Sequence, residues 1–316
     1  MTRKIKNVGV FGIGGIGGYF GGRIAYKINK SIPGSEVYFI ARGEHLRAIQ
    51  EKGLKVVTDK EELVSFPNIA TDKIRHIPTP DLYLLCVKGY DLANAVTEIA
   101  KNIASDTIVL PLLNGVDIYE RVQTILPEGI IIPAAVYVSA FIENQGVIRQ
   151  KGPEGRIVYG PDPNPQHIGY DYQNFKDFFS EIGIRADWFD NPYPAIWEKY
   201  VFIAAFGLTT AYSGKSIGGV LENDELKELT ENIMKEIVLV ARSNGVDLKQ
   251  GVIENSMQVA KGFPYDATTS FQKDYARRDG RNEGDIFGGT LIRMARDHGL
   301  AIPNITAAIH PAINLD

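Results

Sequence analysis

Three glycines near the N-terminus have the spacing of a dinucleotide-binding loop. Gly12, Gly14 and Gly17 form G-x-G-x-x-G directly after the apolar segment 8–11 and at the start of a predicted helix. In this strand–loop–helix setting, Gly12 permits a tight turn, Gly14 lets the backbone approach a pyrophosphate, and Gly17 lets the helix pack close to the strand. Free amide groups at the helix start would bind the phosphates; a glycine loop without a ligand is the alternative. The residues expected to contact the dinucleotide here are Gly12, Gly14, Gly15, Ile16 and Gly17.

The residue that follows the second predicted strand distinguishes NAD from NADP. An NAD site usually places a carboxylate there for the ribose hydroxyls, whereas an NADP site offers an arginine to the 2′-phosphate. In this chain the strand is followed by Arg42, and the first carboxylate after it is Glu44. A guanidinium group is a planar, permanently charged donor that suits phosphate. The sequence therefore predicts NADP as the cofactor, with a solvated loop arginine as the alternative.

Two further polar residues follow buried strands, at the edge where open α/β sheets bind their ligands. Lys88 comes after the apolar segment 84–87, and Asn114 comes after segment 110–113. Each has an ordinary structural explanation, since a lysine can simply emerge into solvent and Asn-Gly is a common turn. Because both would face the same crevice above the glycine loop, we favour a functional interpretation for the pair.

The elements that position these residues alternate through the first half of the chain. Short apolar segments alternate with helical segments, which is typical of a parallel sheet covered by helices. We expect the hairpin-like segment 147–160, with its glycine and proline breaks, to close this sheet. The predicted strands are residues 8–11, 36–41, 81–88, 107–113 and 130–138, and the predicted helices are 15–28, 44–51 and 92–103.

The strand signal fades after residues 188–194, where two prolines interrupt the pattern. Apolar residues then recur at helical spacing, most clearly over 224–242. The predicted helices are 197–212, 223–244, 251–261 and 285–298. The expected fold is a Rossmann-type doubly wound α/β domain over residues 1–190, followed by an all-α substrate domain over residues 191–316.

Composition and charge exclude several classes of function. There are 34 basic and 38 acidic residues, for a net charge of −4, and no basic block, so nucleic acid is not an expected partner. No apolar run reaches the roughly 18 residues of a membrane helix. The single cysteine, Cys86, cannot form an internal disulfide, which indicates a reduced, cytoplasmic protein.

Metal and covalent catalysis also lack a sequence signature. The histidines have no metal-ligand spacing, and the chain has no G-x-S-x-G motif, so we expect neither a metal nor a covalent nucleophile. The sequence leaves open whether the chain is a monomer or a homodimer. The five histidines are His45, His76, His167, His298 and His310.

With these motifs in view, the chain resembles the ketopantoate reductase (2-dehydropantoate 2-reductase) family along almost its whole length. Residues 12–21 are similar to the family's extended glycine signature, and residues 40–43 to its contact with the cofactor 2′-phosphate. Segments 86–88 and 113–115 are similar to two motifs that line the family's cleft. The resemblance implies that Lys88 and Asn114 contact the nicotinamide ribose and the substrate carbonyl region.

The second half supplies the implied catalytic groups. Trp197 and Lys199 match the family's W-x-K, whose lysine is the proposed proton donor. Ser270 and Asp274 are similar to its S-x-x-x-D, in which the serine is associated with the substrate carboxylate. Glu283 matches the glutamate of E-x-D. A free lysine has a pKa near 10.4, so burial or a cationic neighbour would have to lower the pKa of Lys199 toward neutral pH for it to act as the proton donor.

Two positions depart from the family pattern. The asparagines usually found four and eight residues after the catalytic lysine are replaced by Ile203 and Gly207. We therefore expect a more apolar and roomier substrate pocket, although Ile203 could instead be a core residue on a rotated helix. The expected function is NADPH-dependent reduction of a 2-keto acid, for which the family implies 2-dehydropantoate and pantothenate biosynthesis. The alternatives are another 2-keto acid or ketone, or a non-catalytic NADPH-binding regulator. The expected substrate contacts are Lys199, Ile203, Ser270 and Glu283.

Overall fold

The computed structural model describes residues 4–309, so His310 lies outside the described part of the chain. The chain divides into two compact units. The first, here called the sheet unit, runs to Leu113 and resumes over Ile118–Pro192; the second, the helical unit, begins at Tyr193 and also includes the short segment Asn114–Asp117.

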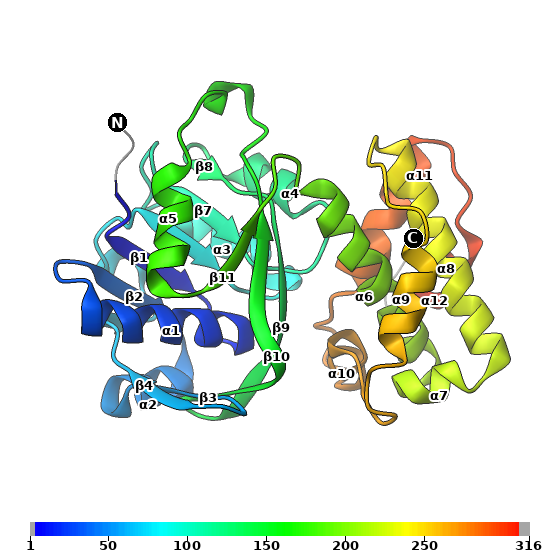
Figure 1. Ribbon diagram of the computed structural model, residues 1–316, viewed down its shortest axis with the longest axis horizontal. Helices are drawn as coiled ribbons and strands as arrows, with labels where there is room; N and C mark the ends of the chain where they lie inside the picture. Colours follow the sequence, from blue (N-terminus) through cyan, green and yellow to red (C-terminus); the bar gives the residue numbers. More distant parts are fainter. Residues whose placement is uncertain (1–3, 310–316) are drawn as a thin grey trace. The chain divides into compact units, whose positions relative to one another are not determined.

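A six-stranded parallel sheet forms the centre of the sheet unit (Figure 1). Its strand order, β5-β2-β1-β6-β7-β8, is that of the doubly wound dinucleotide-binding fold. The predicted Rossmann-type fold class is thus confirmed. The strands are β1 (Asn7–Phe11), β2 (Glu36–Ile40), β5 (Ile69–Thr71), β6 (Leu82–Leu85), β7 (Ile108–Pro111) and β8 (Ile130–Ile131).

The interior strands of this sheet are continuous apolar runs because helices or a second sheet cover both of its faces. All four residues of β6 and of β7 are buried. The first helix lies between the two sheets, in contact with β2 of the parallel sheet and with strands of the second sheet. The helices of the sheet unit are α1 (Gly15–Ser31), α2 (Gly43–Lys52), α3 (Leu92–Ile99), α4 (Ile118–Ile125) and α5 (Gln173–Ile182).

The prediction that segment 147–160 is a hairpin closing the parallel sheet is wrong, because this segment is a single strand of a separate five-stranded sheet. Its glycine and proline breaks produce an irregularity of the strand pairing between Lys151 and Arg156, not a turn. The long strands β9 (Ala134–Asn144) and β10 (Val147–Tyr159) of this sheet pair antiparallel with each other (Figure 1). The start of β10 also pairs with β3 (Leu54–Val57), and its end pairs with β11 (Arg185–Trp188). The strand predicted over 130–138 is divided into β8 and the start of β9, and β4 (Glu62–Ser65) completes the second sheet.

The longest helix of the helical unit is α6 (Tyr193–Ser213), which is apolar on most of its surface and contacts most of the other helices of this unit. The predicted all-α second domain is therefore confirmed. Polar residues begin several of its helices, since the side chains of Ser216, Asn223 and Thr269 each accept a backbone N–H of the first turn. The remaining elements are α7 (Ile217–Leu221), α8 (Asp224–Ser243), α9 (Val252–Ala260), α10 (Ser270–Ala276), the π-turn η4 (Asp285–Gly289), α11 (Thr290–Asp297) and α12 (Pro303–Ile309).

Within residues 4–309, no helix combines the length and the apolar character needed to cross a membrane.

Candidate active site

The glycine loop has the backbone geometry that its spacing predicts. Gly12 follows β1 with φ +93°, a conformation that side chains rarely adopt, and its N–H donates to the Ile40 carbonyl at 3.0 Å. A Cβ at Gly12 would lie 2.6 Å from the Cys86 carbonyl oxygen, and a Cβ at Gly17 would lie 2.0 Å from the Gly12 carbonyl oxygen. The two glycines are therefore required by the turn and by the close packing of α1 on the loop.

The space beside Gly14 is open. Gly14 is the N-cap of α1, no side chain caps this helix end, and a Cβ added there would meet no atom within 4 Å. A helix start with exposed amide groups and a positive dipole end is suited to a phosphate group. Gly15 is different, because a Cβ there would lie 2.0 Å from the Ala140 carbonyl oxygen of β9. The residues present thus fit a bound dinucleotide, with Gly14 offering the approach and Gly15 packing against the hairpin.

Arg42 lies at the end of β2 as the N-cap of α2, with 76% of its side chain exposed. Its Nη2 atom is 3.7 Å from Oδ2 of Asp91. Asp91 belongs to the short 3-10 turn η2 (Gly89–Asp91), which begins directly after the half-buried Lys88. The structure therefore brings the Arg42 side chain next to the segment that follows Lys88, on the edge that also carries the glycine loop.

In the helical unit, Lys199 and Asn114 are in direct contact. The Lys199 Nζ donates a hydrogen bond to Asn114 Oδ1 at 2.8 Å, although 85 residues separate them in the sequence. Lys199 lies in the first half of α6, and Asn114 lies in the segment Asn114–Asp117 that groups with this unit. Two residues that were predicted from separate motifs are thus part of one site.

The electrostatic surroundings of Lys199 change its acidity. Burial lowers the pKa of Lys199 to about 8, because removing an ammonium group from water disfavours its charged form. The negative charge of Glu283 acts in the opposite direction and raises the same pKa. Glu283 itself is buried, with only 3% of its surface exposed, in the loop before η4. The result is a lysine that is a stronger acid than a solvated one and remains largely protonated at neutral pH.

The other predicted substrate residues lie on α6 and α10. Ile203 is half-buried one turn after Lys199, and Ser270 is exposed as the first residue of α10. Asp274 is buried and forms an ion pair with Arg277 at 3.0 Å. A side-chain carbon at Gly207 would be in van der Waals contact with Phe271, 3.7 Å away. The extra room predicted beside Gly207 is therefore occupied on this side by an aromatic side chain.

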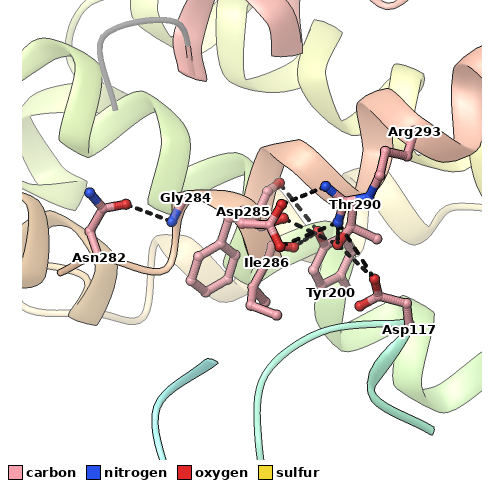
Figure 2. A network of polar contacts seen from close by, with 9 residues as sticks. Asp117, Tyr200, Asn282, Gly284, Asp285, Ile286, Thr290 and Arg293 are labelled. Atoms are coloured by element: carbon pink, nitrogen blue, oxygen red, sulfur yellow. Dashed lines mark hydrogen bonds and ion pairs between the residues drawn. The ribbon is translucent and has the colours of Figure 1, made fainter. Parts of the chain in front are cut away.

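A polar network beside this site was not predicted from the sequence. It consists of Asp117, Tyr200, Asp285, Thr290 and Arg293, and is here called the Thr290 network (Figure 2). Its members come from the segment Asn114–Asp117, from α6, and from the junction of η4 with α11. Its one signal in the sequence is the glycine pair 288–289 inside a helical pattern, which interrupts regular helix formation.

Among residues 4–309, no group of three or more His, Cys, Asp and Glu side chains could hold a metal ion.

Two family models match the chain, one for each half. The model described as "Ketopantoate reductase PanE/ApbA" matches residues 8–164. The model described as "Ketopantoate reductase PanE/ApbA C terminal" matches residues 192–312. The start of the second match lies next to the division between the two units, at Pro192 and Tyr193.

Individual proteins match over nearly the same length. A 2-dehydropantoate 2-reductase of Streptococcus pyogenes serotype M1 is 26% identical over 302 residues, covering 93% of this chain and 94% of that protein. The crystal structure of a PanE/ApbA family ketopantoate reductase from Ralstonia eutropha JMP134 has a TM-score of 0.85 and 26% identity, covering 97% of each chain. A ternary structure of D-mandelate dehydrogenase with NADH and anilino(oxo)acetate has a TM-score of 0.81 and 21% identity, covering 97% of this chain and 98% of that one. The last is similar in fold.

Proposed function

This chain belongs to the ketopantoate reductase family of oxidoreductases, and from that premise we propose that it reduces a 2-keto acid with NADPH, using Lys199 as the proton donor. The observation that carries the proposal is the half-buried hydrogen bond between Lys199 Nζ and Asn114 Oδ1 at 2.8 Å. A lysine held in this way, with its pKa lowered to about 8, has the acidity that proton transfer near neutral pH requires.

Each residue of the site has a defined role in this reaction. The bound nicotinamide supplies the hydride. Lys199 donates a proton to the substrate carbonyl oxygen, and its positive charge stabilises the oxyanion that develops there. Asn114 accepts a hydrogen bond from one of the three N–H groups of Nζ and so fixes the direction of the other two N–H groups. Glu283 keeps Lys199 protonated by its negative charge.

Arg42 supports NADPH rather than NADH as the preferred cofactor. Its guanidinium is exposed at the end of β2, the position at which this fold recognises the ribose 2′ substituent. Arg42 is also the N-cap of α2, and the positive dipole end of this helix favours a bound anion. D-mandelate dehydrogenase, which has a similar fold, was solved with NADH. Because this fold does not by itself select one of the two cofactors, the proposal of NADPH rests on Arg42.

The substrate class is a 2-keto acid, and 2-dehydropantoate is the family's substrate. Ile203 is half-buried one turn after Lys199. Its side chain can neither donate a hydrogen bond to a substrate hydroxyl nor accept one from it. This favours a keto acid without that hydroxyl, or a weaker reaction with 2-dehydropantoate. A non-catalytic NADPH-binding regulator would not require an acidic lysine in contact with Asn114, so we favour the enzyme.

We also propose that the reaction takes place in the cytoplasm. The one cysteine, Cys86, is a buried free thiol, so the fold uses no internal disulfide, which is usual for proteins of a reducing compartment. A homodimer remains a prediction for this chain.

The test is steady-state oxidation of NADPH with a panel of 2-keto acids that includes 2-dehydropantoate, aliphatic 2-keto acids and aryl 2-keto acids. We expect turnover with at least one of them, and a preference for NADPH over NADH. NADPH binding without turnover of any 2-keto acid would contradict the proposed reaction and support a regulator.

A further inference from the structure

We propose that Thr290 is a positioning residue of the active site, whose hydroxyl holds the segment carrying Asn114 and the loop carrying Glu283 in place around Lys199. This inference rests on the proposed role of Lys199. Thr290 does not contact Lys199; it acts through the two segments that it joins.

The hydroxyl of Thr290 has one partner from each of these segments (Figure 2). Thr290 Oγ1 lies 2.9 Å from Oδ2 of Asp117 and 3.1 Å from the backbone oxygen of Asp285. Asp117 is three residues after Asn114, and Asp285 is two residues after Glu283. Thr290 is buried, with 1% of its surface exposed, so water does not readily replace these partners. One side chain therefore joins segments that are 173 residues apart in the sequence.

Arg293 orients this hydroxyl. Its Nη2 atom donates to Thr290 Oγ1 at 3.3 Å, so the single hydroxyl proton of Thr290 is directed to the acceptors on the other two segments. Arg293 also forms a two-point ion pair with Asp285, with distances of 2.5 and 3.3 Å. Gly289 leaves room for this pair, because a Cβ there would lie 2.5 Å from Asp285 Oδ1 and 3.2 Å from Arg293 Nη1.

A second link connects η4 directly to the helix that carries Lys199. Tyr200 is the residue after Lys199. Its hydroxyl donates a hydrogen bond to the carbonyl oxygen of Ile286 at 2.5 Å and lies 3.2 Å from the carbonyl oxygen of Phe287. A π-turn displaces its carbonyls from the regular helical pattern, so they need such partners when buried. The Tyr200 ring is 1% exposed and stacks on Phe287 with an interplanar angle of 11°.

These contacts form a closed series of links that includes the reacting lysine. Lys199 contacts Asn114 directly, Tyr200 joins α6 to η4, and Thr290 joins η4 to the segment of Asn114. Loss of the Thr290 hydroxyl leaves the longer contact between Arg293 Nη2 and Asp117 Oδ2, at 3.9 Å, as the remaining link between these segments, so Asn114 and Glu283 can shift relative to Lys199 while the rest of the fold remains. Displacement of catalytic groups by about 1 Å can reduce a rate by about a hundredfold.

The experiment compares Thr290→Val, which removes the hydroxyl at nearly constant volume, with Thr290→Ser, which keeps it. We expect Thr290→Val to lower kcat about 10- to 100-fold with little change in the KM for NADPH, and Thr290→Ser to restore most of the rate. The matched control is Thr230→Val, which removes another buried threonine hydroxyl of the helical unit, 0% exposed and bonded to Thr209 at 3.0 Å. Equal loss of kcat in Thr230→Val, or no rescue by serine, would overturn the proposal.

A second readout does not require turnover. The pH dependence of Lys199 acylation by acetic anhydride, followed by peptide mass spectrometry, measures the ionisation of this lysine in the intact protein. Asn114 and Glu283 both favour the ammonium form, so Thr290→Val should lower the midpoint and Thr290→Ser should not. An unchanged or raised midpoint in Thr290→Val contradicts the positioning role. An inactive wild type with a midpoint that responds to Thr290→Val would refute the proposed reaction and leave the positioning role intact.

Discussion

The cofactor edge of the sheet unit and the lysine site of the helical unit are built in different ways. The first is formed by the backbone of loop 12–17 and by the side chain of Arg42, which is 76% exposed at the end of the next strand. The second is formed by half-buried and buried side chains from three distant segments, and its central contact joins residues 85 apart. A site of the first kind needs open space and charge, whereas a site of the second kind needs every surrounding hydrogen bond to be satisfied.

This difference predicts two types of response to mutation. Changes at the cofactor edge should act on binding affinity, because its exposed groups contribute individually and are partly screened by solvent. Changes in the lysine site should act on kcat, because its groups are linked to one another and act as a unit. Five experiments test this comparison.

The largest effect is expected for Lys199→Ala. Removing the positioned acid should lower kcat by about 10²–10⁴ while the Kd for NADPH is unchanged. Stopped-flow or steady-state oxidation of NADPH measures the first quantity, and nucleotide fluorescence titration measures the second. A rate loss below tenfold with a good substrate would show that Lys199 is not the proton donor.

Arg42→Ala should act on affinity alone. Loss of a charged hydrogen bond to the 2′-phosphate should weaken NADPH binding by about 1.5–3 kcal/mol, or about 10- to 150-fold. NADH, which lacks that phosphate, should bind the variant as it binds the wild type. Fluorescence titration with both nucleotides provides the comparison, and equal losses for the two would argue against the assignment of Arg42.

The rate should depend on the protonation of Lys199. Because burial lowers the pKa of Lys199 to about 8, its acidic form is present below this pH and is lost above it. The reductive kcat should therefore fall as pH rises through about 8, approaching tenfold per pH unit. Lys199→Arg, whose guanidinium stays protonated, should be slower and lack this alkaline decrease. A wild-type profile that is flat up to pH 10 would contradict the role of Lys199 as acid.

Ile203→Asn tests the substrate side of the lysine site. Supplying a hydrogen-bond partner for a substrate hydroxyl should raise kcat/KM for 2-dehydropantoate relative to a hydroxyl-free keto acid of similar size. The expected gain is about 1 kcal/mol, the net value of one hydrogen bond, or about fivefold. If wild type already uses 2-dehydropantoate efficiently and the variant behaves identically, Ile203 is a packing residue without effect on specificity.

The smallest effect is expected for Asp91→Asn at the cofactor edge. The Asp91 carboxylate lies 3.7 Å from the Arg42 guanidinium, so it competes with a 2′-phosphate for this group and repels it. Its neutralisation should strengthen NADPH binding by up to about 1 kcal/mol, the scale of an exposed ion pair, without changing NADH binding. Glu98→Gln, which removes an exposed carboxylate paired with Lys101, is the charge-matched control. Weaker NADPH binding in Asp91→Asn would show that Asp91 supports the site instead.

Element types followed from the sequence more reliably than sheet membership. The glycine and proline breaks within 147–160 suggest a hairpin there, but this segment is a single strand whose antiparallel partner, β9, precedes it in the chain. The pairing and the choice of sheet depend on the partners that these long strands meet. Strand β10 pairs with β9, β3 and β11 along different parts of its length. Pro133 separates β8 from β9, so the single strand predicted there becomes two strands in different sheets.

By itself, the sequence determined the glycine loop, the position of Arg42 after β2, and the division into an α/β unit and a helical unit. These features depend on residues within a few positions of one another, where turn geometry and hydrophobic periodicity act directly. Only the tertiary structure placed Asn114 against Lys199 and joined Asp117 to Thr290 across 173 residues. The physical reason is that a buried side-chain hydrogen bond is created by packing, and the packing of distant segments has no local pattern in the sequence from which it could be predicted.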